Sequence, residues 1–413
     1  MSEAPCNKTP ISVLHVGKYF PPHVGGMETY LRDLMVASTT LGVRSVALVH
    51  QSKLGLHSSE EQISADGAEI CITRVAVWAR LLFTPLSPIF PWRLRGLIQR
   101  ERPDILHLHL PNPSAFWALL LPSARRLPWV VHWQSDVLTP ESSGFLTIAY
   151  RLYQPLESAL LKRAHKIIAT SPPYLKTSEA LAPVKEQCEV IPLGIKDPFA
   201  NQRASATPED TRIDLSPAAA TPVPLKALAI GRLTHYKGFD VLLEAVAQTS
   251  NITLDLVGTG DQAEVLERLA HSLGITSRVR FHGTVDEDHK NRLLSACDCL
   301  CLPSTDRAES FGVVLLEAMS AARACVVTDV AGSGMSWLVG HQRTGFVTPT
   351  RDAAALATAL CQLRDDRDLA IAFGQAGRQK FEASFTIEAS AAAIQSLYTT
   401  LVEPDQQATR DHR

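Results

Sequence analysis

Short apolar runs alternate along the chain with segments in which apolar residues recur every three or four positions. Residues 11–20, "ISVLHVGKYF", form an apolar, β-rich run that stops at two prolines, and this pattern predicts a strand. Residues 27–42, "METYLRDLMVASTTLG", show helical spacing and end at a glycine, which predicts a helix. Similar apolar runs predict further strands within residues 44–50, 104–110, 128–134 and 164–171.

The same alternation returns from residue 225 onward. Strands are expected within residues 225–233, 252–260, 278–285, 298–304 and 324–330, and helices within 239–249, 263–274, 289–296 and 312–321. Strands that alternate with helices imply parallel sheets with helices on both faces. The pattern therefore predicts an α/β fold of two doubly wound, Rossmann-like domains. Such sheets bind ligands at the carboxyl ends of their strands, so a site is expected in a cleft between the domains.

One stretch interrupts the alternation and marks the domain boundary. Residues 200–224, "ANQRASATPEDTRIDLSPAAATPVP", are rich in Ala, Pro, Ser and Thr and show no sustained periodicity, as expected of a linker. We therefore predict a first domain at residues 1–200, a linker at 201–224 and a second domain at 225–377. Residues 378–413 are predicted to form a terminal helix followed by a polar, frayed tail.

The bulk properties narrow the class of protein. A length of 413 residues fits two domains, and a net charge of −2 gives no global reason to expect nucleic acid as a partner. The beginning, "MSEAPCNKTP", lacks a basic start followed by an apolar run, so no signal peptide is expected. The apolar stretches are far shorter than the roughly 20 residues of a membrane span. A cytoplasmic protein is predicted, and the eight scattered cysteines suit a reducing compartment.

Two groups of side chains have the alternation that would suit metal ligands. Cys297, Cys299 and Cys301 point to one face of an expected strand, and so do His107 and His109. No further Cys pair or Cys/His cluster near the cysteines completes a four-ligand shell, and the histidines lack acidic or Cys neighbours in sequence. We therefore predict that both groups pack inside the protein and that no metal is bound. His15 and His50 likewise fit strand positions.

Cations and glycines follow the expected strands of the second half. Arg232 comes directly after a strand and Lys237 lies five residues on, in "IGRLTHYKG". Two cations at the carboxyl end of a strand suit a diphosphate, although a solvated basic turn would have the same sequence. Gly258 and Gly260 in "LVGTGD" allow a close backbone approach to a ligand. The third glycine of the dinucleotide fingerprint is missing.

Two glutamates flank an uncharged stretch, "ESFGVVLLEAMS". A helix start is expected near Ser310–Val313, after a strand and its loop, and a helix start binds phosphate readily. Glu309 then precedes the helix and can meet the reacting end of a ligand. Glu317, about two turns into the helix, can bind a diol such as ribose. An exposed charged rim around an amphipathic helix is the alternative explanation.

Taken together, these motifs resemble the retaining, nucleotide-sugar-dependent glycosyltransferases of family 4, which have two Rossmann-like domains (the GT-B fold). The resemblance rests on "GRLTHYKGFDVLLEA", "LVGTGD", "FHGTV" and "ESFGVVLLEAMS" in the second half. In the first half it rests on "KYFPPHVGGMETYLRDL", "DILHLHLPNP", "VVHWQSD" and "VIPLGI". It extends from about residue 11 to 400, and it implies that the terminal helix crosses back to the first domain.

The resemblance implies a role for each matching residue. Arg232 and Lys237 would bind the donor diphosphate, Glu309 would contact the transferred sugar, and Glu317 would bind the ribose. The residues implied in catalysis are Glu309, His132, Arg232 and Lys237. Those implied in donor binding are Gly25, Gly26, Arg232, Lys237, Gly258, Gly260, Val285, Ser310, Phe311, Gly312, Val313 and Glu317. Those implied near the acceptor are His132 and Asp136.

The implied reaction moves a hexosyl group from a nucleotide sugar to a hydroxyl of a glycan or polyprenol-linked acceptor in surface polysaccharide or lipopolysaccharide synthesis. GDP-mannose is the expected donor, with UDP-glucose or UDP-N-acetylglucosamine as alternatives. The chain has no Asp-x-Asp motif, so donor binding without a metal or other cofactor is expected. A sugar-nucleotide epimerase and a non-catalytic sugar-nucleotide-binding partner are the other functions considered.

A proline-rich segment adds a possible membrane partner. Residues 77–103 combine aromatic and basic side chains, namely Trp78, Phe83, Phe90, Trp92, Arg80, Arg93 and Arg95. Such a segment could dock peripherally on the anionic inner face of a membrane. Ordinary helix packing within the first domain explains the same residues equally well.

Overall fold

The computed structural model describes residues 10–23, 25–81, 84–137, 144–200 and 223–410, without the side chains of 144–149 and 404–410. The chain divides into two compact units. Unit 1 comprises Met1–Gly194 and Ile387–Arg413, and unit 2 comprises Ile195–Thr386. The predicted linker at residues 201–224 lies outside the described residues apart from Val223 and Pro224.

Unit 1 contains an eight-stranded sheet in the order β10-β9-β8-β7-β1-β2-β4-β3. Neighbouring strands are parallel except β3 and β4, which are antiparallel. The strands are β1 (Ile11–Val16), β2 (Val43–Leu54), β3 (Ser59–Ala65), β4 (Ala68–Val77), β7 (Ile105–Leu110), β8 (Trp129–Trp133), β9 (Lys166–Ala169) and β10 (Cys188–Val190). A separate hairpin pairs β5 (Ala79–Leu81) with β6 (Thr84–Leu86).

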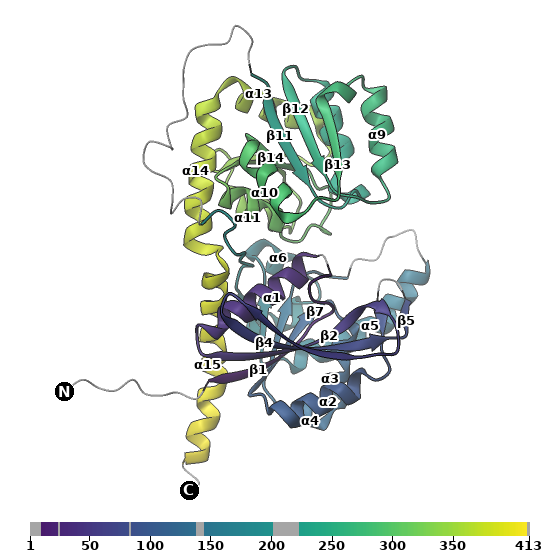
Figure 1. Cartoon of the computed structure of the whole chain (residues 1–413), viewed down its shortest axis with the longest axis vertical. Helices are drawn as coiled ribbons and strands as arrows, with labels where there is room; N and C mark the ends of the chain where they lie inside the picture. The colour runs from purple at the N-terminus through teal and green to yellow at the C-terminus, as the bar shows by residue number, and fades with distance from the viewer. Residues whose placement is uncertain (1–9, 24, 82–83, 138–143, 201–222, 411–413) are drawn as a thin grey trace, which may run out of the picture. The chain divides into compact units, whose positions relative to one another are not determined.

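Helices cover both faces of this sheet (Figure 1). They are α1 (Gly26–Thr39), α2 (Phe90–Glu101), α3 (Trp117–Leu120), α4 (Pro122–Arg125), α5 (Gly144–Arg163), α6 (Pro172–Thr177) and α15 (Ile387–Arg410), with 3-10 turns η1 (Pro113–Phe116) and η2 (Ala182–Gln187). Apolar residues of α2 pack with one face of the sheet, and α1 packs with β2 and β4 on the other. Alternating strand residues therefore supply two cores, one on each face.

Unit 2 contains a six-stranded parallel sheet in the order β13-β12-β11-β14-β15-β16. Its strands are β11 (Leu225–Ile230), β12 (Ile252–Val257), β13 (Val279–Gly283), β14 (Cys299–Leu302), β15 (Ala324–Thr328) and β16 (Gly345–Thr348). Its helices are α8 (Phe239–Ala247), α9 (Ala263–Ser272), α10 (Glu287–Ala296), α11 (Val313–Ser320), α12 (Met335–Leu338), α13 (Ala353–Asp365) and α14 (Arg367–Ser384), with 3-10 turns η3 (His235–Lys237) and η4 (Thr276–Arg278). Both units thus have the predicted doubly wound, Rossmann-like architecture.

The three cysteines of "SACDCLCL" are buried, as the core interpretation predicts. Cys299 and Cys301 lie in β14 and belong to the main apolar cluster of unit 2. Cys297 is also buried, but it precedes the strand and caps α10. All three are free thiols. A strand that includes all three cysteines was therefore the wrong expectation, because β14 begins at Cys299, two residues after Cys297.

The end of the second unit differs from the sequence-based boundary. Arg378, where the terminal helix was expected to begin, lies inside α14 of unit 2. Its guanidinium pairs with Asp197 at 2.5 Å and donates to the carbonyl oxygen of Ser320 at 2.7 Å. These contacts hold α14 within unit 2. The chain passes to unit 1 only after Thr386, and α15 then packs against α1.

Candidate active site

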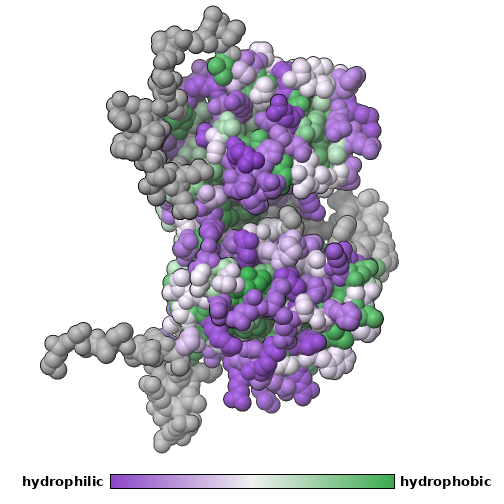
Figure 2. All heavy atoms as spheres, viewed as in Figure 1, coloured by the Kyte–Doolittle hydropathy of each residue, from purple (hydrophilic) through white to green (hydrophobic). Residues whose placement is uncertain are grey.

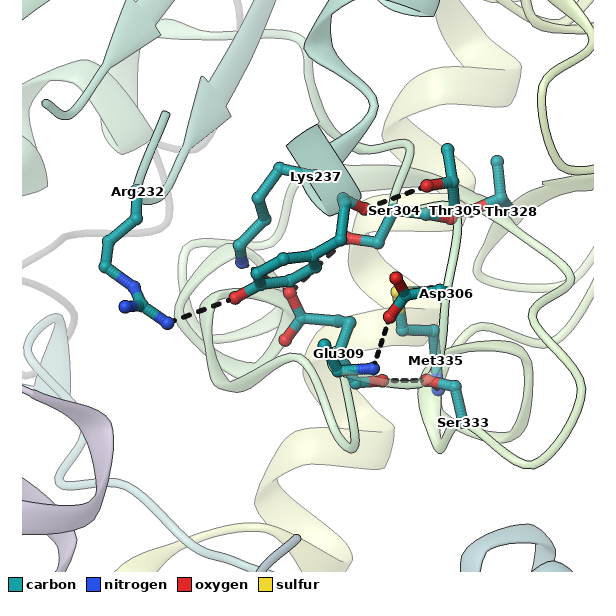
Figure 3. Close-up of polar contacts among 11 residues, drawn as sticks. Arg232, Lys237, Ser304, Thr305, Asp306, Glu309, Thr328, Ser333 and Met335 are labelled. Carbon is teal, nitrogen blue, oxygen red and sulfur yellow. Dashed lines mark hydrogen bonds and ion pairs between the residues drawn. The ribbon is translucent and has the colours of Figure 1, made fainter. Parts of the chain in front are cut away.

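The carboxyl ends of the unit 2 strands bring together residues from distant parts of the sequence. Arg232 follows β11, Lys237 ends η3, and Glu309 lies in the loop between β14 and α11. Because β11 and β14 are parallel neighbours, their carboxyl ends meet at one edge of the sheet. Figure 3 shows these three side chains on adjoining loops.

An ion pair joins Lys237 to Glu309. The Lys237 ammonium donates to Glu309 Oε2, and the side chains are only 11% and 13% exposed. The hydroxyl of Ser304 donates to the same carboxylate oxygen at 3.3 Å, and the hydroxyl of Ser333 donates to the backbone oxygen of Glu309 at 2.5 Å. Both the charge and the backbone of Glu309 are therefore held in place before any ligand binds (Figure 3).

Arg232 is the exposed member of this group. Its guanidinium donates to the Tyr236 hydroxyl at 3.4 Å, and the Lys237 ammonium lies 5.7 Å from the centre of the Tyr236 ring. Tyr236 therefore contacts both cations, Arg232 through its hydroxyl and Lys237 through its ring. The site presents an exposed guanidinium on the outside and a buried, ion-paired ammonium within, a suitable arrangement for two oxygens of a diphosphate.

Glycines permit the close approach of the loops around the cations. Gly258 has a φ of +138°, and a Cβ there would lie 1.9 Å from the carbonyl oxygen of Gly231. A Cβ at Gly260 would lie 2.2 Å from the carbonyl oxygen of Leu233. These contacts are with backbone and cannot be relieved by a rotamer change. Both glycines thus allow the β12 loop to lie against the β11 loop.

The helix after Glu309 begins at Val313, with Gly312 as its N-cap at a φ of +84°. Glycine supplies no side-chain capping oxygen, and within the first turn the Leu315 amide donates to the carbonyl oxygen of Gly312 at 2.8 Å. Glu317 is the fifth residue of α11 and therefore lies little more than one turn into the helix. The expectation of about two turns is wrong because the helix starts at the late end of the predicted window.

Glu317 does not join the Lys237–Glu309 group in the structure. Its carboxylate pairs at 2.8 Å with Lys290 of α10, which also pairs with Glu287 at 2.8 Å. Burial raises the pKa of Glu317, and the nearby Lys290 charge opposes that rise. The two glutamates of "ESFGVVLLEAMS" therefore occupy separate electrostatic environments. Lys290 is a partner that sequence reasoning missed.

The other predicted donor-binding residues of unit 2 are buried or half-buried. Phe311 is 2% exposed and belongs to the interior. Val285, between β13 and α10, and Ser310 are half-buried. The carbonyl oxygen of Ser310 accepts from the amide of Gly334 at 2.8 Å, which ties the α11 loop to the loop before α12.

In unit 1, Gly25 and Gly26 form the start of α1. Gly25 is the N-cap in an extended conformation that any residue can adopt. A Cβ on Gly25 would nevertheless lie 2.1 Å from Oε2 of Glu28, a buried carboxylate in the first turn. Gly25 thus makes room for Glu28, and Gly26 is exposed.

His132 lies in a buried group of four histidines, here called the histidine quartet: His15, His107, His109 and His132. His15 is in register with His107, and His109 with His132, so all four side chains share one face of β1, β7 and β8. They are at most 7% exposed. Tyr30 of α1 contacts the edge of His132, and the Tyr398 hydroxyl of α15 lies 2.5 Å from Nδ1 of His107.

Burial keeps the quartet uncharged. Burial lowers the pKa of His15 and the pKa of His132 to about 3. The neighbouring His132 lowers the pKa of His15 further. The pKa values of His107 and His109 are also well below the ordinary range, because of burial and then of the neighbouring histidines. His107 and His109 therefore pack inside the fold, as predicted.

Three members of the quartet bring ligand atoms close enough for a metal to be considered. Nitrogen atoms of His15, His107 and His109 lie within 4.8 Å of one another. The rings of His107 and His109 are stacked, however, with centroids 4.4 Å apart and planes inclined by only 19°. A ring nitrogen binds a metal in the plane of its ring, and nearly parallel planes do not converge on one ion. The observed orientation therefore favours packing over coordination.

Asp136 follows β8 and is held by its own neighbours. Its Oδ1 accepts from Nε1 of Trp133 at 2.9 Å and from the Ser178 hydroxyl at 2.7 Å. Burial and then the charge of Asp136 raise the pKa of Glu157, on α5, to about 7. Glu157 was not anticipated from the sequence, because only the packing of α5 brings the two carboxylates near each other.

Comparisons with known proteins agree with this architecture. Residues 25–194 match the family described as "Glycosyl transferase 4-like domain", and residues 219–380 match "Glycosyl transferases group 1". The O-antigen chain mannosyltransferase C of Escherichia coli is 28% identical over 400 residues, which cover 95% of this chain and 99% of the relative. The D-rhamnosyltransferase WbpZ of Pseudomonas aeruginosa is 28% identical over 375 residues, covering 91% and 92%.

A solved structure shows the same fold. Anabaena HepE in complex with UDP-glucose superimposes with a TM-score of 0.67 at 20% identity, covering 94% of this chain and all of that chain. The fold is therefore GT-B, as the resemblance implied. The chain belongs to the family 4 type of GT-B glycosyltransferases, and it is a glycosyltransferase enzyme.

Proposed function

We propose that this glycosyltransferase is a retaining hexosyltransferase that uses a nucleotide sugar, with GDP-mannose as the first candidate donor. The acceptor is a hydroxyl of a glycan or polyprenol-linked sugar in surface polysaccharide or lipopolysaccharide synthesis. The name of the E. coli relative supports mannose and O-antigen assembly. The UDP-glucose complex of HepE supports a nucleotide-sugar donor, and UDP-glucose and UDP-N-acetylglucosamine are the alternatives.

The buried Lys237–Glu309 pair beside Arg232 carries the proposal. The reaction breaks the bond between sugar C1 and the diphosphate oxygen and forms a bond between C1 and the acceptor oxygen. The acceptor proton leaves with the nucleoside diphosphate. Negative charge grows on the diphosphate. The cations of Arg232 and Lys237 stabilise it together with the backbone amides at the start of α11, those of Gly312 and Val313.

Glu309 has a second task in this proposal. Positive charge develops on the transferred sugar while the C1–O bond breaks, and a carboxylate near the sugar stabilises that charge. A bound diphosphate competes with Glu309 for the Lys237 ammonium. Donor binding would therefore loosen the ion pair and free carboxylate oxygens for the sugar hydroxyls. Glu317 is proposed to bind the donor ribose, while Gly25 and Gly26 form a loop that packs against the donor.

The proposed reaction needs no metal, because two cations and a helix start take over the charge stabilisation that Mg²⁺ supplies in many enzymes. Activity that persists unchanged in EDTA is the expected result. A requirement for added Mg²⁺ or Mn²⁺ would contradict this part of the proposal.

The deciding experiment incubates the full chain with GDP-mannose, UDP-glucose and UDP-N-acetylglucosamine and measures release of nucleoside diphosphate. Slow hydrolysis of one donor, which a mannoside acceptor accelerates, is expected. Lys237→Met should abolish release, whereas Lys226→Met, an exposed substitution in the same unit, should not. Conversion to an isomeric nucleotide sugar would indicate an epimerase. Binding without turnover would indicate a non-catalytic partner.

Unit 1 also carries exposed aromatic and basic side chains within residues 77–103, which we propose contact an anionic membrane. Trp78 is 51% and Trp92 70% exposed, and Arg93 and Arg95 are exposed on the same helix as Trp92. Phe90 is fully buried and does not take part, which corrects the sequence-based set, and Phe83 lies outside the described residues. Among the helices of the described chain, none is long and apolar enough to span a bilayer.

Flotation with liposomes tests the membrane contact. Binding to vesicles that contain anionic lipid, and loss of binding in Trp92→Ser with Arg93→Ser, are the expected results. The face of the molecule seen in Figure 2 is mainly hydrophilic with apolar residues interspersed. Failure of the protein to float with any lipid would contradict the membrane contact.

A further inference from the structure

One buried side chain at the carboxyl end of β8 has no partner for either of its polar atoms. Gln134 directly follows β8 and is only 4% exposed. Neither its amide nitrogen nor its amide oxygen makes a hydrogen bond within the described residues. Buried polar atoms are nearly always paired, so a carboxamide with two unpaired groups at a strand end points to a ligand or to ordered water.

The position of Gln134 is where a doubly wound sheet receives its ligand. The backbone amide of Gln134 donates to the carbonyl oxygen of Leu110 at 3.1 Å and so continues the strand pairing by one residue. Strand alternation therefore turns its side chain to the same face as His132. Gln134 lies two residues nearer than His132 to the carboxyl edge of the sheet. This edge is where such sheets bind ligands.

A second unpaired group lies at the matching position of the next strand. Trp133 pairs with Ala169 at the end of the β8–β9 ladder, so Gln134 and Thr170 are the next residues in register. Thr170 is fully buried, and its hydroxyl has no hydrogen-bond partner in the described parts of the chain. The carboxamide of Gln134 and the hydroxyl of Thr170, both neutral and polar, are therefore neighbours at the carboxyl edge of the sheet.

The chemistry of these groups selects the class of ligand. A carboxamide and a hydroxyl both donate and accept hydrogen bonds and carry no charge. The hydroxyl groups of a neutral sugar do the same. A phosphate would instead require cations, whereas the face of the sheet that carries Gln134 also carries the uncharged histidine quartet.

We propose that Gln134 is a specificity-determining residue of the glycosyl transfer, which hydrogen-bonds through its carboxamide to hydroxyl groups of a neutral hexose, with Thr170 beside it. The sugar is either the transferred hexose of the donor or the terminal sugar of the acceptor. His132 then acts as a positioning residue, because it is fully buried beneath the edge and covered by Tyr30. This inference rests on the proposed function.

The test compares two glutamines of the same sheet. Gln134→Met keeps the length of the side chain and removes both polar atoms. Gln187→Met is the matched control, because Gln187 immediately precedes β10, at the opposite edge, and also has an unpaired amide oxygen. The full chain is assayed with the donor that the wild type hydrolyses, GDP-mannose first, alone and with methyl α-mannoside as acceptor.

We expect Gln134→Met to lower kcat/KM at least tenfold, with an unchanged melting temperature, while Gln187→Met behaves as the wild type. A higher KM for hydrolysis of the donor alone would identify the donor sugar as the ligand. A higher KM for methyl α-mannoside alone would identify the acceptor sugar. Binding of the nucleoside diphosphate, which has no hexose, should not change in either case.

Unchanged kinetic constants for donor and acceptor in a folded Gln134→Met protein would overturn the proposal, and water would then satisfy the carboxamide. An equal loss of nucleoside diphosphate binding would overturn it too, because the effect would not belong to the sugar. Failure of the wild type with every nucleotide sugar is a different result. It would reject the proposed function itself.

Discussion

The two sheets of this glycosyltransferase have similar parallel topologies but present opposite chemistry at their carboxyl ends. Unit 2 gathers an ammonium, a guanidinium and a carboxylate in Lys237, Arg232 and Glu309. Unit 1 places the uncharged Gln134 at the end of β8, on the face of the histidine quartet, and the carboxylate of Asp136, two residues on, accepts hydrogen bonds from neutral side chains. The fold fixes where a ligand meets each sheet, and the side chains select its kind. Charged groups suit a diphosphate, and neutral ones suit sugar hydroxyls.

The largest effect is expected from the charged edge. Glu309→Gln retains the size of the side chain but removes the charge that pairs with Lys237, and transfer should fall about 100-fold or more. Release of nucleoside diphosphate in the presence of acceptor measures the loss. Glu264→Gln is the control, because the Glu264 side chain is 88% exposed on the same unit. Equal, small losses of transfer activity in Glu309→Gln and Glu317→Gln would indicate that both glutamates have only a structural role.

The glycines of the two units should respond differently to an added methyl group. Gly258→Ala puts a Cβ against the backbone of Gly231 at a φ that suits only glycine, and a loss of about 3 kcal/mol is expected. Gly25→Ala meets only the Glu28 side chain, which can move, so less than about 1.5 kcal/mol should be lost. Thermal melting followed by circular dichroism compares the two. A larger loss for Gly25→Ala would contradict this explanation.

Acid should destabilise the neutral sheet face of unit 1. Burial lowers the pKa of His15 and His132 to about 3, below the ordinary value of about 6.5 in the unfolded chain. The unfolded state then binds more protons, so stability falls as the pH drops from about 6.5 toward 3, by up to about 1.4 kcal/mol per histidine and pH unit. Urea unfolding at pH 7, 6 and 5 measures this slope.

A single substitution shows whether the quartet causes that slope. His132→Gln removes one buried imidazole, and the pH dependence of the unfolding free energy should decrease by about one proton. His57→Gln changes an exposed histidine of the same unit and should leave the slope unaltered. An identical slope in all three proteins would assign the acid sensitivity to other groups.

The smallest effect is expected at Glu317. Since Lys290 neutralises this carboxylate, Glu317→Gln should weaken donor binding about tenfold through the lost ribose contact and leave kcat nearly unchanged. Initial rates at varied donor concentration give KM and kcat for Glu317→Gln and the wild type and so test this prediction. A fall in kcat with an unchanged KM would place Glu317 closer to the reacting atoms than proposed.

Much of this molecule could be predicted from local patterns. The strands at the sheet centres, such as β1, β7 and β11, are buried on both faces, and so they are continuous apolar runs in the sequence. Edge strand β3 was missed because it is largely exposed and polar. Its hairpin turn, Asp66-Gly67, has positive φ values of 51° and 78°. This Asp-Gly turn is the one signal that could have revealed it.

The site was predictable in its residue types but not in its partners. Glu309 and Lys237 could be identified from their positions after strands, whereas their mutual contact depends on how β11 and β14 lie in the sheet. The pairing of Glu317 with Lys290 and the register of the histidine quartet are likewise set by contacts between distant segments. Periodicity in a single segment carries no information about such contacts.

Helix α15 has a consequence for synthesis of the chain on the ribosome. Its Ser390 hydroxyl lies 2.9 Å from the Tyr30 hydroxyl and donates to the carbonyl oxygen of Pro192, and its Tyr398 contacts His107. Unit 1 therefore stays incomplete, with its polar sheet face uncovered, until residues beyond Thr386 have been made. Unit 2 is continuous in sequence and can fold first. This order reverses the usual one, in which the N-terminal domain folds before the next.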